Sequence, residues 1–312
     1  MLGDKHGNIV HLYERDCSIQ RRHQKVIEIA PSVVLSDEKR QEICNDALKI
    51  AKSVNYQNAG TLEFLVDMHG NHYFIEMNPR VQVEHTITEM VTGIDIVQSQ
   101  ILIAEGYSLD SDEINIKSQE DITKRGFAIQ CRITTEDPTN NFAPDTGKID
   151  VYRTSAGFGV RLDGGNGYSG AVISPYYDSL LVKATAYSRT YKDAVRKAIR
   201  AIKEIKITGV KTNIDFLINV LNNETFQKGE CDTNFISDNP QLFDISPRSD
   251  YEQRILKYLG EKVVETSGIK TEYDVPVIPD VTGLEKKAGT KQILDSKGPE
   301  GVVEWIKSQN KL

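Results

Sequence analysis

Hydrophobic and polar positions change their spacing several times along the chain, and each change predicts a different element. After a short apolar strand at residues 9–13, apolar residues recur every three or four positions between residues 37 and 54, which predicts a helix. Ser36 stands where its side chain can cap this helix, and Asp37 and Glu38 suit the positive end of the helix dipole. We expect the helix to pack its apolar face on a sheet.

Residues 61–78 alternate between apolar and polar positions on both sides of a Gly-Asn turn signal, which predicts a β-hairpin. If the turn occupies residues 68–71, Glu63 lies directly opposite Glu76. One face of the hairpin is then expected to be wholly apolar, with side chains from Leu62, Phe64, Val66, Tyr73, Ile75 and Met77. Both glutamates lie on the other face.

The rest of the chain predicts further helices and strands in two more segments. A second helix is expected at residues 88–104, and the acidic, polar residues 108–124 indicate a domain boundary. Beyond it, residues 126–133 and 179–187 have the composition of strands. Thr190 and Asp193 resemble a capping box at the start of a helix that Gly209 is expected to end. Composition changes again at residues 239–250, and short helices are expected near 251–262 and 298–309.

Composition places the chain among soluble globular proteins. It has 312 residues, of which 39% are hydrophobic and 27% charged, enough for two or three cores. The sequence contains neither a run of 18 apolar residues nor the apolar segment of a signal peptide at its start, so we expect no membrane association and a cytoplasmic location. The formal net charge of −7 argues against a nucleic-acid partner, because such binding needs a broad basic face.

The predicted pairing of Glu63 with Glu76 requires compensation, because like charges opposed across a hairpin repel. A divalent cation is the economical compensation, and Asn78 on the same face adds a further hard oxygen ligand. Few protein ligands in a polar setting favour Mg²⁺ that also carries phosphates. Solvation of both glutamates on an exposed sheet face is the alternative, and the pairing alone does not decide between the two.

The residues that follow the hairpin, NPRVQVEH, favour the metal hypothesis. We interpret them as a strand on which Arg80, Gln82 and Glu84 share one face. Arg80 and Gln82 could grip a small planar oxyanion, and Glu84 could serve as a general base. An ordinary polar edge strand is the alternative.

A second candidate anion site lies in ERDCSIQRRHQKV, residues 14–26. Its cationic or potentially cationic side chains, which repel one another, are Arg21, Arg22, His23 and Lys25. The crowding predicts a bound anion near this segment.

Several long motifs resemble the biotin carboxylase component of biotin-dependent carboxylases, an ATP-grasp family. In chain order they are ERDCSIQRRHQKV, GTLEFL, FIEMNPRVQVEHTITE, GFAIQCRI, GFGVRLD and PYYDSLLVK, and the resemblance covers about residues 1–245. It implies an α+β fold in three parts. Residues 1–107 are expected to form the C-terminal part of an ATP-grasp domain with a mostly antiparallel sheet. Residues 108–245 would form the biotin carboxylase C-terminal α/β domain, and residues 246–312 a linker with helices.

In that family ATP and bicarbonate give carboxyphosphate, which carboxylates biotin carried on a separate domain. The resemblance implies Mg²⁺ or Mn²⁺ as a cofactor, held by Glu63, Glu76 and Asn78. ATP contacts are implied for Gln20, His23, Glu63 and Glu76. Bicarbonate contacts are implied for Lys25, Arg80, Gln82 and the backbone of Val83. The catalytic residues implied are Lys25, Arg80, Glu84 as the base that deprotonates bicarbonate, and Arg161, which binds biotin and stabilises its enolate.

The tail, which contains NNETFQKGECDTNFI and NPQLFDI, is similar to the linker of pyruvate carboxylases. There the linker leads into a carboxyltransferase domain, so this domain, the biotin carrier domain and a homo-oligomeric parent enzyme are the partners implied. Carboxylation of biotin for transfer to pyruvate, giving oxaloacetate, is the activity implied. An acetyl-CoA or propionyl-CoA carboxylase, and a non-catalytic assembly module, are the alternatives.

The chain departs from the family at its N-terminus. The Rossmann-like first domain, the glycine-rich lid and the ATP-contacting lysines that precede this point in the family have no counterpart in the sequence. We therefore expect the isolated chain to have negligible ATPase or biotin carboxylation activity. A bicarbonate-dependent ATPase assay of the chain alone would test this expectation.

Overall fold

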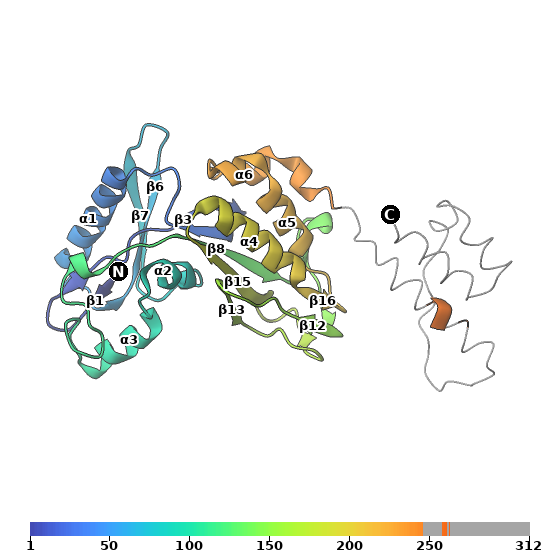
Figure 1. Ribbon diagram of the computed structural model, residues 1–312, viewed down its shortest axis with the longest axis horizontal. Helices are drawn as coiled ribbons and strands as arrows, with labels where there is room; N and C mark the ends of the chain where they lie inside the picture. Colours follow the sequence, from blue (N-terminus) through green and yellow to red (C-terminus); the bar gives the residue numbers. More distant parts are fainter. Residues whose placement is uncertain (246–257, 261, 263–312) are drawn as a thin grey trace. The chain divides into compact units, whose positions relative to one another are not determined.

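The largest sheet among the described residues of the structure, a computed structural model, has five strands in the order β13-β15-β8-β4-β3 (Figure 1). In that order its strands are Val160–Gly164, Leu180–Ser188, Phe127–Thr134, Gln24–Ala30 and Asp16–Arg21. Helix α4, Tyr191–Glu204, packs against β15 and β8, while α2, His85–Thr92, packs against β8, β4 and β15. The expected strands at residues 126–133 and 179–187 are thus present. Every strand pairing in the described part of the chain is antiparallel.

The structure describes residues 1–245, 258–260 and 262. The chain divides into two units after Ile245, and in the first, Met1–Ile245, the sheet joins strands from both sides of residue 107. The division into 1–107, 108–245 and 246–312 stays a prediction. The helix expected near 298–309 lies outside the described residues, as does the one near 251–262 apart from residues 258–260 and 262, which are helical.

Helix α4 follows the capped, amphipathic pattern of its sequence. The Thr190 hydroxyl accepts a hydrogen bond from the Asp193 backbone N–H, and the buried side chains of the helix include Val195 and Ile202. The helix ends at Glu204 and not at Gly209, because residues 206–208 form strand β16, which pairs with β12, Val151–Arg153.

Replacing Thr190 with alanine is expected to lower the free energy of unfolding by about 1 kcal/mol, because the helix loses its side-chain cap. Urea denaturation of the chain measures this loss. Thr190→Ser keeps the hydroxyl and serves as the control, with an unfolding free energy close to that of the unchanged chain. An equal loss in both variants would show that the methyl group, and not the cap, stabilises this turn.

The N-terminal part carries helix α1, Asp37–Ser53, beside a small sheet of order β2-β1-β5 (Figure 1). Ser36 caps α1 as predicted, with its hydroxyl accepting from the Lys39 backbone N–H. The strands of the small sheet are Ile9–Val10, Leu2–Gly3 and Asn58–Ala59, so the strand expected at residues 9–13 is only two residues long.

The prediction of one helix at residues 88–104 is wrong. The chain forms two helices, α2 and α3, Ile96–Glu105, which are bent by 93° relative to one another. Gly93 ends α2 in the left-handed region, at a φ of +74°, where glycine carries no steric penalty. Asp95 then caps α3 by accepting from the Gln98 backbone N–H.

Strands β6, Thr61–Val66, and β7, His72–Asn78, form the predicted hairpin, and Glu63 pairs with Glu76 as expected. A β-bulge follows this pair, so Phe64 lies opposite Phe74 and not opposite Ile75. The prediction of one wholly apolar face is therefore wrong beyond Glu63. Tyr73 and Ile75 of β7 are 55% and 58% exposed, so apolar side chains of this strand remain uncovered among the described residues.

The remaining elements are short. They are the strand pairs β9, Glu136–Asp137, with β10, Ala143–Pro144, and β11, Gly147–Lys148, with β14, Val172–Ile173; the helices α5, Ile214–Asn222, α6, Glu224–Lys228, and α7, Phe235–Asp238; and the 3-10 turns Gln119–Asp121, Pro138–Asn140 and Pro240–Phe243.

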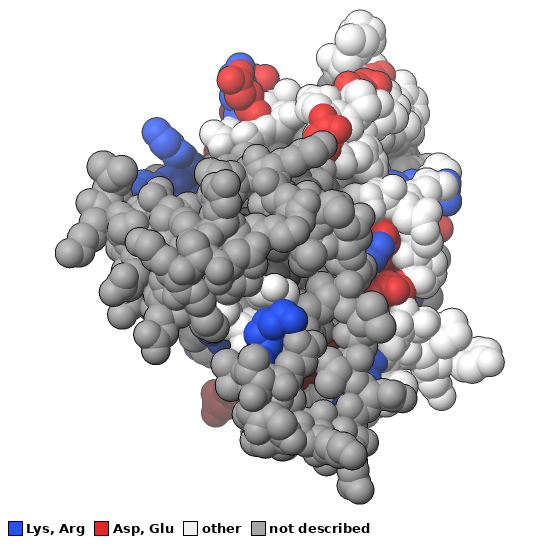
Figure 2. Space-filling view, turned by 90° about the vertical axis from the view of Figure 1, so that its right-hand side faces the viewer, with Lys and Arg blue, Asp and Glu red and all other residues white. Residues whose placement is uncertain are grey.

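Basic and acidic side chains are intermixed over the described part of the face in Figure 2. No single helix among the described residues is long and apolar enough to span a membrane, although the bent pair α2 and α3 meets the same criteria when taken together.

Candidate functional site

Lys25 of β4 is the centre of the candidate site. Its Nζ donates to Glu63 Oε1 of β6 and to Glu84 Oε1 before α2, both at 2.7 Å. Burial lowers the pKa of Lys25, but the hydrogen bonds to Glu63 and Glu84 contribute to a net rise. One ammonium group therefore holds together two carboxylates that the sequence separates by 21 residues.

The two hairpin glutamates lie on one face and share an amide. Asn78 Nδ2 donates to Glu63 Oε1 at 3.2 Å and to Glu76 Oε1 at 2.9 Å. Gln82 Nε2 also donates to Glu63 Oε1, at 2.7 Å. Hydrogen bonds from neighbouring groups thus offset part of the repulsion that we expected a cation to relieve.

The oxygen atoms in this corner fit an open Mg²⁺ site. Two carboxylates and one amide oxygen are hard ligands, and their small number suits a metal that takes its other ligands from phosphates and water. In the part of the chain that the structure describes, no three His, Cys, Asp or Glu side chains converge as a metal cage. Metal binding here requires the Asn78 amide to turn its oxygen toward the metal.

The prediction of a strand at residues 80–84 is wrong, because these residues form a loop that leads into α2. Gln82 and Glu84 are nevertheless buried and both contact groups of the Lys25 cluster. Arg80 is exposed, and its guanidinium lies 3.4 Å from Asn78 Oδ1. The side chains of Arg80, Gln82 and Glu84 therefore lie near the hairpin glutamates although they come from a loop and not from a strand.

Sequence reasoning missed two arginines of the site. Arg132 of β8 donates through NH2 to Glu84 Oε2 at 3.0 Å and through Nε to Glu28 Oε1 at 2.5 Å. Arg15 donates to Gln82 Oε1 at 2.7 Å. Burial raises the pKa of Glu84, but Arg15 and Lys25 lower it below its ordinary value, so this carboxyl is ionised at neutral pH.

Gln20 and His23, for which the resemblance implied ATP contacts, lie on the β3–β4 hairpin. Gln20 pairs with Lys25 in the sheet, and its amide donates to the Cys17 carbonyl oxygen at 2.8 Å. His23 lies in the turn and is exposed. Arg21 and Arg22 both donate to Asn141 Oδ1, so their crowding is relieved in part by the chain itself.

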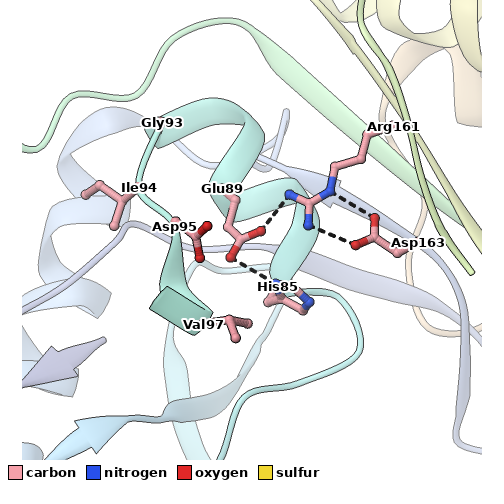
Figure 3. A pocket seen from close by; sticks show the side chains of 8 residues that line it. All are labelled: His85, Glu89, Gly93, Ile94, Asp95, Val97, Arg161 and Asp163. Atoms are coloured by element: carbon pink, nitrogen blue, oxygen red, sulfur yellow. Dashed lines mark hydrogen bonds and ion pairs between the residues drawn. The ribbon is translucent and has the colours of Figure 1, made fainter. Parts of the chain in front are cut away.

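Arg161 lies apart from the Lys25 cluster, on β13, in a cavity of about 510 Å³ (Figure 3). Its guanidinium donates to Asp163 on the same strand and to Glu89 of α2. The cavity is lined by His85, Glu89, Gly93, Ile94, Asp95, Val97, Arg161 and Asp163. Helix α2 connects the Lys25 cluster with the Arg161 cavity, because Glu84 directly precedes the helix and Glu89 lies on it.

Two family models match the chain. The carbamoyl-phosphate synthase L chain ATP-binding domain matches residues 1–112, and the biotin carboxylase C-terminal domain matches residues 130–238. Pyruvate carboxylase of Staphylococcus aureus is 55% identical over 99% of this chain, and that of Bacillus subtilis is 55% identical over all of it. The chain is homologous to the biotin carboxylase region of pyruvate carboxylases. It spans 28% of the length of these two relatives.

Solved structures agree with this homology and with the predicted α+β class. The biotin carboxylase subunit of a pyruvate carboxylase is 48% identical with a TM-score of 0.75, over 78% of this chain and 53% of that one. Pyruvate carboxylase of Rhizobium etli, with the allosteric activator acetyl coenzyme A, is 48% identical with a TM-score of 0.81, over 98% of this chain and 31% of that one. A biotin carboxylase domain of Hydrogenobacter thermophilus 2-oxoglutarate carboxylase is 46% identical with a TM-score of 0.75, over 78% of this chain and 52% of that one, and contains MgADP, ADP and bicarbonate.

Proposed function

We propose that the chain supplies the metal, bicarbonate and biotin side of a biotin carboxylase site in a pyruvate carboxylase. In this reaction ATP and bicarbonate carboxylate biotin, which later transfers the carboxyl group to pyruvate to give oxaloacetate. The observation that carries the proposal is the convergence of Glu63, Gln82 and Glu84 around Lys25. The bicarbonate and MgADP in a 46% identical biotin carboxylase domain support it.

Each residue of the cluster has a role in this proposal. Glu63, Glu76 and Asn78 would hold Mg²⁺, which supplies positive charge to the phosphates. Gln20 and His23 lie on the nucleotide side. Arg80, Gln82, Lys25 and the Val83 backbone N–H would bind the bicarbonate oxygens. Lys25 would have to exchange its present carboxylate partners for the incoming anion.

Glu84 is the proposed base. It is buried and ionised, and its flanking cations Lys25 and Arg132 hold the carboxylate in place without a proton. Removal of the bicarbonate proton by Glu84 yields a dianion that Arg80 and Lys25 stabilise. Arg161 would bind biotin and stabilise the negative charge of its enolate.

The partners and the location belong to the same proposal. The biotin carrier domain would bring biotin to the Arg161 side, and a carboxyltransferase domain would use the product. We also propose a homo-oligomeric parent enzyme in the cytoplasm. The 98% coverage of this chain by the Rhizobium etli pyruvate carboxylase supports the multidomain setting.

Replacing Glu76 with glutamine is expected to raise the Kd of Mn²⁺ with ADP by about tenfold or more, because one of two carboxylate ligands loses its charge. Electron paramagnetic resonance of free Mn²⁺, titrated with the chain at fixed ADP concentration, measures this. Glu42→Gln is the matched control, since Glu42 lies on α1 and pairs with Lys39 outside the site. An unchanged Kd for Glu76→Gln would refute the metal assignment and with it the metal side of the proposed function.

A further inference from the structure

The Arg161 guanidinium is held from two elements at once (Figure 3). Asp163, two residues along the same strand, accepts from Nε at 2.9 Å and from NH2 at 2.8 Å. Glu89 of α2 accepts from NH1 at 2.6 Å. A single counter-ion already neutralises an arginine, and the bidentate contact with Asp163 supplies one. The second carboxylate, from a different element, fixes the guanidinium relative to α2 as well as to β13.

Glu89 is itself fixed in place. Its side chain is 8% exposed, and Oε1 accepts from the Ile96 backbone N–H at 2.9 Å, which ties it to the first turn of α3. His85 Nδ1 lies 3.1 Å from Oε1 but makes no hydrogen bond of good geometry. Burial raises the pKa of Glu89, but the nearby His85 and the hydrogen bond from Arg161 lower it to about 2. Glu89 is therefore a carboxylate of fixed place and charge.

Helix α2 is also fastened to the sheet at its N-terminal end. Lys183 of β15 donates to the Val83 carbonyl oxygen at 3.1 Å and lies 3.3 Å from His85 Nε2. The Thr86 hydroxyl bonds to Thr185 of β15 at 2.9 Å, and Thr185 pairs with Arg161 in the sheet. Contacts of α2 with the sheet therefore fix the loop of Gln82, Val83 and Glu84 in position relative to β13, the strand of Arg161.

We propose that Glu89 is a positioning residue, which ties Arg161 to α2 so that its guanidinium keeps a fixed place relative to Glu84. The functional meaning rests on the proposed function, in which Arg161 faces biotin while Glu84 acts on bicarbonate. Asp163 alone would orient Arg161 only within its own strand. Through Glu89, helix α2, which follows Glu84 in the chain, also holds Arg161.

Hydrogen exchange of the Arg161 side chain tests this in the full 312-residue chain. The guanidinium N–H signals are observed in ¹⁵N NMR spectra and assigned by their loss in Arg161→Lys. Glu89→Gln is expected to speed exchange of the NH1 protons by about tenfold or more, because a charge-assisted hydrogen bond is lost. Glu204→Gln, which removes the exposed carboxylate partner of Arg200 on α4, is the control and leaves Arg161 exchange unchanged.

Asp163→Asn provides a second arm should Glu89→Gln fail to fold. It is expected to speed exchange at Nε while the NH1 protons stay slow, because Glu89 still accepts from them. A lower melting temperature with unaltered Arg161 exchange in Glu89→Gln, or fast NH1 exchange in Asp163→Asn, would overturn the proposal. Neither arm needs a ligand, so the inference can fail while Mn²⁺–ADP binding succeeds, and the reverse.

Discussion

Replacing Glu84 with glutamine is expected to lower bicarbonate-dependent ATP cleavage by about 10²–10⁴-fold, the usual contribution of a general base. The glutamine has nearly the same shape but cannot take the bicarbonate proton. It also leaves Lys25 and Arg132 with one charged partner each. The assay uses Staphylococcus aureus pyruvate carboxylase in which this chain replaces the matching segment, with the unsubstituted exchange enzyme as the reference.

A matched variant separates the loss of the base from a general loss of charge. Glu204→Gln also neutralises one glutamate, but on the exposed side of α4, and is expected to keep the reference rate. If Glu84→Gln turns over within threefold of the reference while remaining folded, Glu84 is not the base. A rise in the KM for bicarbonate with unchanged kcat would instead place Glu84 in binding alone.

Replacing Arg132 with methionine is expected to lower the free energy of unfolding by about 3–5 kcal/mol, the usual cost of breaking a buried ion pair from one side. Glu28 is fully buried, and besides Arg132 its carboxylate accepts a hydrogen bond from Gln130. The methionine side chain is unbranched like that of arginine but carries no charge, so the Glu28 carboxylate is left without its cation. Urea denaturation of the chain measures the loss.

The loss should also depend on pH. Burial raises the pKa of Glu28, and Arg132 opposes this rise, so the variant raises it further. A folded state that binds the Glu28 proton more tightly than the unfolded chain does loses stability as pH rises. The loss of unfolding free energy in Arg132→Met is therefore expected to be larger at pH 8 than at pH 5. Lys49→Met, which removes an exposed pair with Asp46, is the control and should cost less than about 1 kcal/mol. A penalty for Arg132→Met as small as that control would contradict the prediction.

Local sequence patterns were sufficient where one element determines its own geometry. Ser36 and Thr190 cap their helices as predicted, because a hydroxyl before an amphipathic run satisfies the free N–H groups of the first turn. The Gly-Asn signal predicted the hairpin, but next to the turn the register differs by one residue, since Val66 pairs with His72, and the bulge after Glu63 restores the predicted pairing of Glu63 with Glu76. The bulge at Phe64 could not be predicted, because an alternating pattern contains no mark of one inserted residue.

Other features depend on contacts between distant segments. The alternation in NPRVQVEH predicts a strand, but the loop exists because Gln82 and Glu84 bond to Arg15 and Lys25 from distant segments of the chain. The role of Arg132 was missed although its motif was noted, since nothing local indicates that it faces Glu84. The homology to pyruvate carboxylases was predicted from motif order and confirmed, whereas the roles of the site residues stay predictions.

The open hairpin has a practical consequence for handling the protein. Strands β6 and β7 form a two-stranded sheet on which Leu65, Tyr73, Phe74 and Ile75 are about half exposed. Uncovered apolar strands with free edges attract copies of themselves. Concentrated stocks should therefore cloud or scatter light sooner than dilute ones, and a lysine in place of Ile75 should delay that clouding.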